Sequence, residues 1–280
     1  MRNRKSLTIF LISLPAFGYI IFWFLIPSLN LVAFSIYTKK GMGVQMEIRT
    51  TPTLENYIEA LSGWYLDSLI WTIGVATVIA TVAIIIALPV AYYLSRIEGP
   101  KAFIDLSLLF PFFGGIFYGY ALLYAFAPQG IINWLLMNLH IISEPIRLLK
   151  TNESAVIVMT IVDTSLAIML LRSSLIDVDP VYEEAAMTLG ATPIKTFFKI
   201  DLPLVKRALA GAWLLIFGGE LASYNIPYIV AGPHNKWIST MLYRELTQYT
   251  NFPLSASIAV VLTLLSSGVL LLYMKIFERG

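Results

Sequence analysis

The 280-residue sequence contains no cysteine and only two histidines, His140 and His234. It therefore offers no disulfide framework and no thiolate nucleophile. Both histidines fall in segments expected on the external side, so no paired-histidine metal site is predicted. Charged residues are scarce as well, at 13% of the chain, whereas soluble proteins have about 25%. With 58% hydrophobic residues, this composition predicts an integral membrane protein.

The motifs of several enzyme classes are also absent. The sequence has no G-x-x-x-x-G-K-[ST] phosphate loop, which a chain that hydrolyses ATP by that route requires, and no HExxH or nucleophile elbow. An enzyme would have to rely on two separate acids in apolar segments, Asp163 and Glu220. We therefore predict no catalytic residue, no metal and no cofactor bound by this chain. The formal net charge of +2 gives no reason to expect a nucleic-acid partner.

Long apolar stretches dominate what is present. Six windows are long enough to cross the roughly 30 Å hydrocarbon core, which takes about 20 helical residues. They predict an all-α membrane protein with six transmembrane helices in a single domain, 1–280, without internal repeats or linkers. Pro15 and Pro27 indicate a kink in the first window. The predicted spans are 8–37, 68–95, 104–127, 153–175, 208–231 and 255–277.

The distribution of basic residues predicts the orientation of these spans. With the N-terminus inside, 12 of the 19 lysines and arginines fall on the cytoplasmic side and 7 on the opposite side. Positive charge is enriched in cytoplasmic loops, so both termini and the polar loop 177–206 are predicted to face the cytoplasm. Residues 131–142, which are apolar but too few to cross, predict an interfacial helix on the external side.

The loop 177–206 reads as a pair of short soluble helices. Pro180 is suited to a first helical turn, and Glu183 and Glu184 are good helix formers behind it. Gly190 can provide a left-handed stop, and Thr192 can cap a second helix that Pro193 opens. The loop is thus predicted to form a compact amphipathic knob with a small-residue surface for another protein.

The spacing within this loop carries a resemblance. Glu184-Ala185-Ala186, then Gly190, then nine residues and Ile200-x-Leu202-Pro203 resemble the EAA loop of the permeases of ABC importers. The ending of the second window, Pro89 to Arg96, is similar to the same family. The stretch 53–57, Thr-Leu-Glu-Asn-Tyr, is similar to polyamine-type and some sugar permeases, and it also reads as a helix capped by Thr53. The alternative interpretation of the loop is an ordinary cytoplasmic linker.

The resemblance implies the six-helix architecture of a type I ABC-importer permease in a prokaryotic inner membrane. The EAA loop would be the coupling helix that docks on a cytoplasmic ATPase, with ATP and Mg²⁺ held by the partner. The implied partners are two ATPase subunits, a second permease expected to be a homologous sister chain, an extracytoplasmic solute-binding protein and membrane lipid. The implied ATPase-coupling residues are Glu183, Glu184, Ala185, Ala186, Leu189, Gly190, Ala191, Ile200, Leu202 and Pro203.

The substrate expectation follows from smaller features. Leu189-Gly190-Ala191 is similar to the branch that imports polyamines, ferric iron, thiamine and phosphonates, whereas sugar permeases more often carry Asp before that glycine. Against a polyamine permease, the third window lacks an arginine, and Ser165 stands where a proline is expected. We predict a spermidine/putrescine-type solute, with ferric-iron, thiamine, phosphonate or sugar import as alternatives. A non-ABC secondary carrier is the competing class.

Two acids lie well inside predicted spans, Asp163 in the fourth and Glu220 in the fifth. A central acid is costly in a bilayer, so each is expected to face protein or water. Gly218, Gly219 and Pro227 indicate that the fifth span is interrupted. We predict that Glu220, Tyr224, Asn225, Asp163 and Tyr120 line the substrate path. The alternative is a structural role, such as a hydrogen bond to the sister permease.

Overall fold

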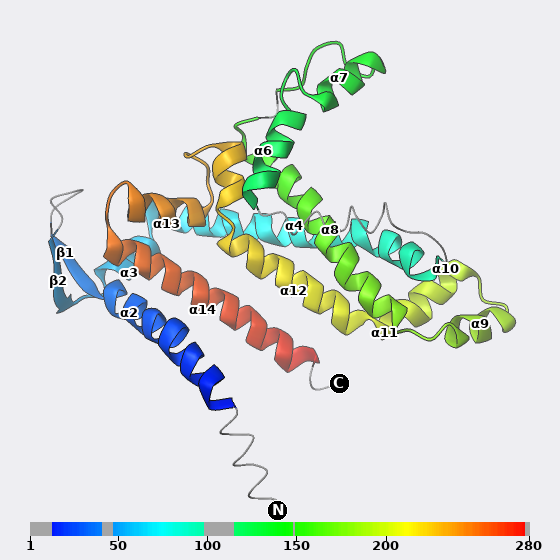
Figure 1. The fold of residues 1–280 in the computed structure, drawn as a ribbon, viewed down its shortest axis with the longest axis horizontal. Coiled ribbons are helices and arrows are strands. Elements are labelled where there is room, and N and C mark those ends of the chain that lie inside the picture. The colour runs from blue at the N-terminus through cyan, green and yellow to red at the C-terminus, as the bar shows by residue number, and fades with distance from the viewer. Residues whose placement is uncertain (1–12, 41–46, 98–114, 148, 278–280) are drawn as a thin grey trace, which may run out of the picture. The chain divides into compact units, whose positions relative to one another are not determined.

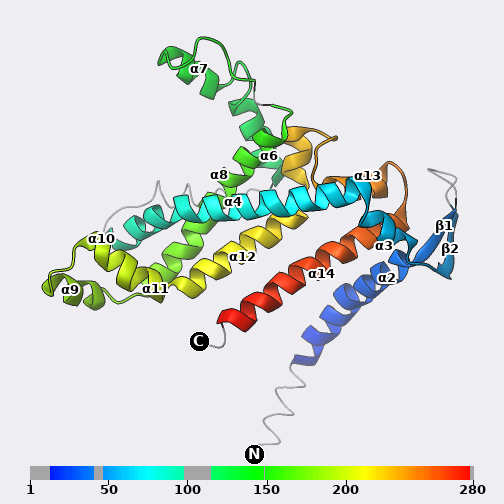
Figure 2. The ribbon, with the colours of Figure 1, turned by 180° about the vertical axis from the view of Figure 1, so that it is seen from behind.

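The computed structural model describes residues 13–40, 47–97, 115–147 and 149–277, and these form two compact units. The first unit combines residues 1–66 with residues 241–264, and the second combines 67–240 with 265–280. Figures 1 and 2 follow the chain through its helices from opposite sides.

The first unit is built around the buried side chain of Asn56. Its Nδ2 donates to the backbone carbonyl oxygens of Ser35 and Tyr37, each at 2.9 Å, and the backbone carbonyl oxygen of Asn56 accepts from Ser257 Oγ at 3.2 Å. One residue thus joins the end of one helix, the start of a hairpin and a later helix. The elements of this unit are η1 (Ile21–Leu25), α2 (Ile26–Ser35), β1 (Tyr37–Lys40), β2 (Glu47–Pro52), α3 (Glu55–Ala60), α13 (Ile238–Thr247) from Met241 on, and α14 (Phe252–Phe277) as far as Leu264.

The strands β1 and β2 pair antiparallel, with a register shift between Tyr37 and Thr38. The helix ahead of them contains a π-helical turn, η1, directly before α2 and its Pro27. A proline lacks the N–H that an α-helix needs and its ring clashes with the preceding turn, and a wider turn relieves that conflict. The irregularity expected of the first span therefore takes the form of a π turn.

The second unit contains the large apolar core. The core lies between α4, α8, α12 and η5, with Trp237 at one end. The elements of this unit are α4 (Gly63–Arg96, from Asp67 on), α6 (Gly115–Ala125), α7 (Ile131–Asn138), α8 (Asn152–Ile176), α9 (Val181–Thr188), α10 (Pro193–Thr196), η4 (Phe197–Asp201), α11 (Leu202–Leu204), α12 (Lys206–Ala222) and η5 (Pro227–Ala231).

A row of alanines along α4 forms the centre of this core. Residues three or four apart share one helix face, and five alanines at this spacing are almost fully buried. They are Ala76, Ala80, Ala83, Ala87 and Ala91. In lipid, small residues of this kind let helix backbones approach closely, and van der Waals packing then holds the helices together. The alanine row therefore forms the α4 side of the core that this helix shares with residues of α8 and α12.

Within the described residues, four helices are long and apolar enough to cross a membrane: 13–35, 63–96, 152–176 and 252–275. The third predicted span, 104–127, begins outside the described residues and continues as α6. The fifth, 208–231, corresponds to α12 and η5, separated by non-helical residues from Ser223. The described residues are thus mostly helical and include helices suited to cross a membrane, but the all-α prediction did not include the β1–β2 hairpin. The number of six spans and the single domain stay predictions. The interfacial helix, expected over 131–142, ends at Asn138.

Enlarging one member of the alanine row tests the packing argument. We expect Ala83→Leu to lower the free energy of unfolding by about 1–3 kcal/mol, because the side chain has no space between the helices. Val82→Leu, at a 37% exposed position on the same helix, is the control and should change little. Thermal unfolding of both variants in detergent provides the comparison. Equal stability of the two would contradict close packing at Ala83.

Candidate functional site

The loop after α8 folds as a compact helical knob, as its sequence predicts. The helix α9 begins after Pro180 and ends in a Schellman motif, in which Ala191 N–H donates to Ala186 O at 3.0 Å and Gly190 N–H to Met187 O at 2.9 Å. Gly190 has φ of +85°, a left-handed conformation that favours glycine. Thr192 caps the next helix by accepting from Lys195 N–H. The chain thereby reverses within three residues and places α10 and η4 against α9.

The residues predicted for ATPase coupling divide between the surface of the knob and its interior. Leu189, at the end of α9, is 89% exposed. Glu183, by contrast, faces inward with only 13% of its side chain exposed. The exposed residues of the set are Glu184, Ala185, Leu189, Gly190 and Pro203, and the half-buried ones are Glu183, Ala186, Ala191, Ile200 and Leu202. The EAA register thus presents one acid outward and leaves its neighbour inside.

The inward acid binds Arg96, in the last turn of α4. Arg96 Nε donates to Glu183 Oε1 at 2.7 Å, and its Nη2 forms an ion pair with the same carboxylate. Arg96 Nη1 donates to the carbonyl oxygen of Leu175 at 3.0 Å, near the end of α8. Tyr92, one turn earlier on α4, donates its hydroxyl to Glu183 Oε2 at 3.2 Å. The knob is thus attached to the ends of both α4 and α8.

A second buried acid lies beside this ion pair. Asp201 of η4 is fully buried, and its Oδ1 lies 3.7 Å from Arg96 Nη2. Burial raises the pKa of Asp201 to about 6, and the nearby Glu183 carboxylate adds to this effect while the Arg96 guanidinium opposes it. One guanidinium therefore faces two carboxyl groups, which makes the ionisation of Asp201 sensitive to pH in the weakly acidic range.

The two acids inside the membrane helices, Asp163 of α8 and Glu220 of α12, lie together. Their side chains are hydrogen-bonded to each other. One oxygen of each, Asp163 Oδ2 and Glu220 Oε2, is buried without a hydrogen-bond partner among the described residues. The helices α8 and α12 pack side by side, which explains the contact between acids that are far apart in the sequence.

The other residues predicted for the substrate path have different surroundings. Tyr224 and Asn225 lie in the break between α12 and η5, where both are half-buried. The break leaves backbone groups outside regular helix close to the last turn of α12, which contains Glu220. Tyr120 lies on α6 and is 51% exposed. At the preceding Gly119, an added Cβ atom would lie only 3.0 to 3.2 Å from the side chain of Ile229 of η5, so this face of α6 is closely packed. The described contacts therefore join two of the five residues directly.

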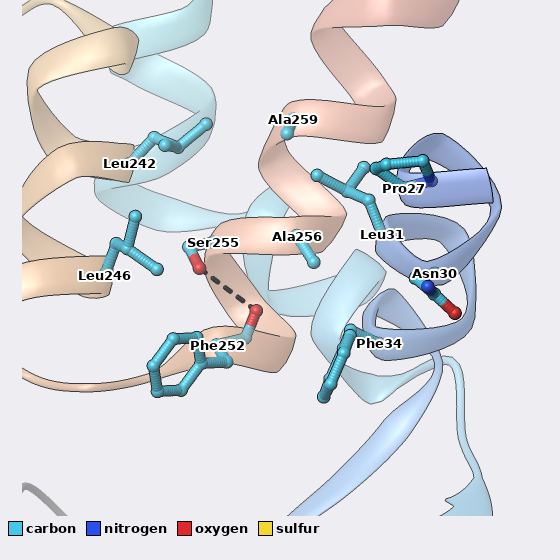
Figure 3. Close-up of a pocket in the computed structure, with 10 residues that line it drawn as sticks. All are labelled: Pro27, Asn30, Leu31, Phe34, Leu242, Leu246, Phe252, Ser255, Ala256 and Ala259. Carbon is cyan, nitrogen blue, oxygen red and sulfur yellow. Dashed lines mark hydrogen bonds between the residues drawn. The ribbon is translucent and has the colours of Figure 1, made fainter. Parts of the chain in front are cut away.

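A separate groove lies in the first unit, between α2, α13 and α14 (Figure 3). Its volume is about 370 Å³, and its lining is almost entirely apolar. The hydroxyl of Ser255 is directed to the carbonyl oxygen of Phe252 at 3.0 Å rather than offered to a ligand. With this lining the groove suits hydrocarbon, and it lacks the charge that would hold a polar solute. The acids of α8 and α12 are the better candidate for a solute site.

The sequence did not identify Arg96, Tyr92 and Asp201 as functional residues. Arg96 was recognised only as the end of a family-like helix, and its partners lie 79 to 105 positions further along the chain. A weak signal existed, because Tyr92 and Arg96 are four residues apart and thus share one helix face. Asp201 lies between Ile200 and Leu202 of the motif, and nothing local indicates that it is buried.

The chain was also compared with known proteins. No protein-family model matches it. The spermidine/putrescine transport system permease protein PotB of Salmonella typhimurium is 23% identical over 260 residues, 92% of this chain and 90% of that protein. PotB of Haemophilus influenzae is 24% identical over 262 residues, again 92% and 90%. This chain is also similar in fold to a chain in the crystal structure of a bacterial alginate ABC transporter in complex with an alginate pentasaccharide-bound periplasmic protein. The similarity covers 99% of this chain and 96% of that chain, with a TM-score of 0.75 and 14% sequence identity.

The buried acid Asp201 leads to a prediction about pH. Its pKa in the folded protein, about 6, lies above the ordinary 3.8, so the folded protein binds more protons than the unfolded chain between these values. Stability should therefore fall as the pH rises through this window. We expect Asp201→Asn to show a smaller fall in melting temperature, measured in detergent between pH 4 and pH 7. Asp179→Asn, at an exposed position, is the control and should keep the wild-type slope. Identical slopes for all three proteins would exclude this role of Asp201.

Proposed function

We propose that this chain, a multi-pass membrane protein similar to ABC-importer permeases in sequence and fold, is the membrane-spanning subunit of a polyamine importer. It transports spermidine- or putrescine-like cations with ATP hydrolysed by partner subunits that hold the nucleotide and Mg²⁺. Two ATPase subunits bind on the cytoplasmic side, a sister permease completes the pathway, and a solute-binding protein delivers the substrate from outside. The complex lies in a prokaryotic inner membrane with both termini of this chain in the cytoplasm.

The exposed face of the knob supports docking on the ATPase. Leu189, 89% exposed, and Ile194, 72% exposed, present apolar surface at the tip of the α9–α10 turn. Apolar side chains clustered in this way on a soluble knob mark a surface that another protein covers. The small side chain of Ala185 lies on the exposed part of α9, where a partner backbone can approach. The outward Glu184 adds one charge to this surface.

Two substitutions on the knob test this docking. Ala185→Trp should obstruct the contact, since overpacking typically costs about 1–3 kcal/mol, or roughly 5- to 150-fold in affinity. Gly190→Val should have a similar effect because valine does not readily adopt the positive φ of this turn. The measurements are copurification of the ATPase and solute-stimulated ATP hydrolysis in reconstituted complexes. Thr192→Ser, which keeps the helix cap, is the control. Wild-type coupling in both main variants would exclude α9 as the docking element.

The carboxyl pair supports a cationic solute. Asp163 and Glu220 each have a buried oxygen without a partner in the described structure, and a carboxylate is the natural counter-ion of an ammonium group. Proteins of 23–24% identity that are named spermidine/putrescine permeases point in the same direction. In the proposed mechanism, rocking of the helices opens the path to one side of the membrane at a time, and the pair contacts an ammonium group as it passes.

Glu220→Gln tests this role, because it keeps the size and hydrogen bonding of the side chain while removing its charge. We expect a rise in the KM for spermidine import of roughly tenfold, equivalent to about 1.4 kcal/mol of lost binding. Glu153→Gln, at an exposed position in the first turn of α8, is the control. Unchanged import kinetics in a normally assembled Glu220→Gln complex would show that Glu220 does not recognise substrate charge.

A further inference from the structure

The end of α4 contacts both halves of the knob. Tyr92 and Arg96 lie one turn apart on one helix face, and each touches α9 and η4. Tyr92 donates its hydroxyl to Glu183 of α9, while its ring meets the ring of Phe197 of η4 edge-on at 4.7 Å. Arg96 holds Glu183 through two nitrogens and lies near Asp201 of η4. These contacts join α4 to both α9 and η4.

Arg96 also reaches a third element. Its Nη1 donates to the carbonyl oxygen of Leu175, one of the carbonyls that an α-helix leaves without an internal partner at its end. A cation is favoured at this end of α8 by the helix dipole. The planar guanidinium can serve all these partners at once because its five N–H groups point in fixed directions. Arg96 thus connects two membrane helices and both parts of the knob at a single point.

We propose that Arg96 is the positioning residue that makes the knob and α4 move as one body, so that movement imposed on the knob is transmitted to the membrane helices. This inference rests on the proposed docking of α9 on an ATPase. The side chains that an ATPase would contact and those that bind Arg96 are distinct, since Glu184 is exposed and Glu183 faces Arg96. Loss of Arg96 should therefore leave docking intact and disturb transmission.

The readout that separates transmission from docking is the number of solute molecules imported per ATP hydrolysed. In reconstituted complexes with the ATPases and the binding protein, we expect Arg96→Gln to retain the ATPase and to hydrolyse ATP. Import per ATP should fall by about fivefold or more, the lower end of ordinary coupling between sites. Glu183→Gln, which removes the partner charge, should show the same pattern. Arg207→Gln, an exposed cation at the start of α12, is the control and should keep the wild-type ratio.

The absence of cysteine from the chain allows a direct test of the mechanical role. In the double variant Arg96→Cys/Glu183→Cys, a short bis-maleimide can react only with these two thiols of the chain. We expect low import per ATP before cross-linking and recovery afterwards, because a covalent link replaces the ion pair. A role limited to charge or to folding predicts no recovery.

The outcomes are distinguishable. A wild-type complex that retains no ATPase, or imports nothing, would overturn the proposed function itself. A wild-type complex that imports normally, together with an Arg96→Gln complex of unchanged ratio, would overturn this inference alone. So would a cross-linked double variant that hydrolyses ATP without recovered import. If Arg96→Gln fails to assemble, Glu183→Gln and the cross-linking experiment still decide.

Discussion

Close packing of helices within lipid is the constraint on which the second unit depends. Apolar side chains gain little by moving from lipid to protein, so helix association relies on shape and on polar contacts. The buried alanine row of α4 contributes to that shape, because its small side chains lie in the core shared with residues of α8 and α12. The acid pair lies where α8 and α12 meet, and the Arg96 cluster lies where α4 and α8 end.

Polar groups in this environment need partners within the protein, and the two sites meet that need differently. In the membrane helices, the carboxyl groups of Asp163 and Glu220 are hydrogen-bonded to each other, and one oxygen of each has no hydrogen-bond partner among the described residues. At the end of α4, a permanently charged guanidinium binds one carboxylate, lies near a second and also satisfies a helix-end carbonyl. The first arrangement has capacity left for a ligand. In the second, the guanidinium N–H groups already bind partners on other elements and hold these elements together.

Local sequence signals predicted the knob well, since its turn depends on neighbouring residues. Gly190 has the expected positive φ, and Thr192 caps the following helix as expected. The sequence does not predict which of Glu183 and Glu184 is directed toward α4. Adjacent helical residues point about 100° apart, so only one of the two can meet that helix. The contacts of Asp163 with Glu220 and of Arg96 with Glu183 depend on how separate helices pack. The stretch 53–57, noted for its resemblance and as the start of a capped helix, contains Asn56, whose buried hydrogen bonds organise the first unit.

The π turn η4 has a consequence for the spacing of side chains in the knob. Thr196 and Asp201 are both buried although they are five residues apart, and Val205 follows on the same side four residues later. In a regular α-helix five residues advance by about 500°, which would place Asp201 about 140° away from Thr196. The wider turn absorbs the extra residue and brings both to one face. With one residue fewer between 197 and 200, Asp201 would follow Thr196 by four positions, and a regular α-helix would then keep the two within about 40° of each other. The π turn is therefore the way in which this segment holds one additional residue without turning Asp201 away from Arg96.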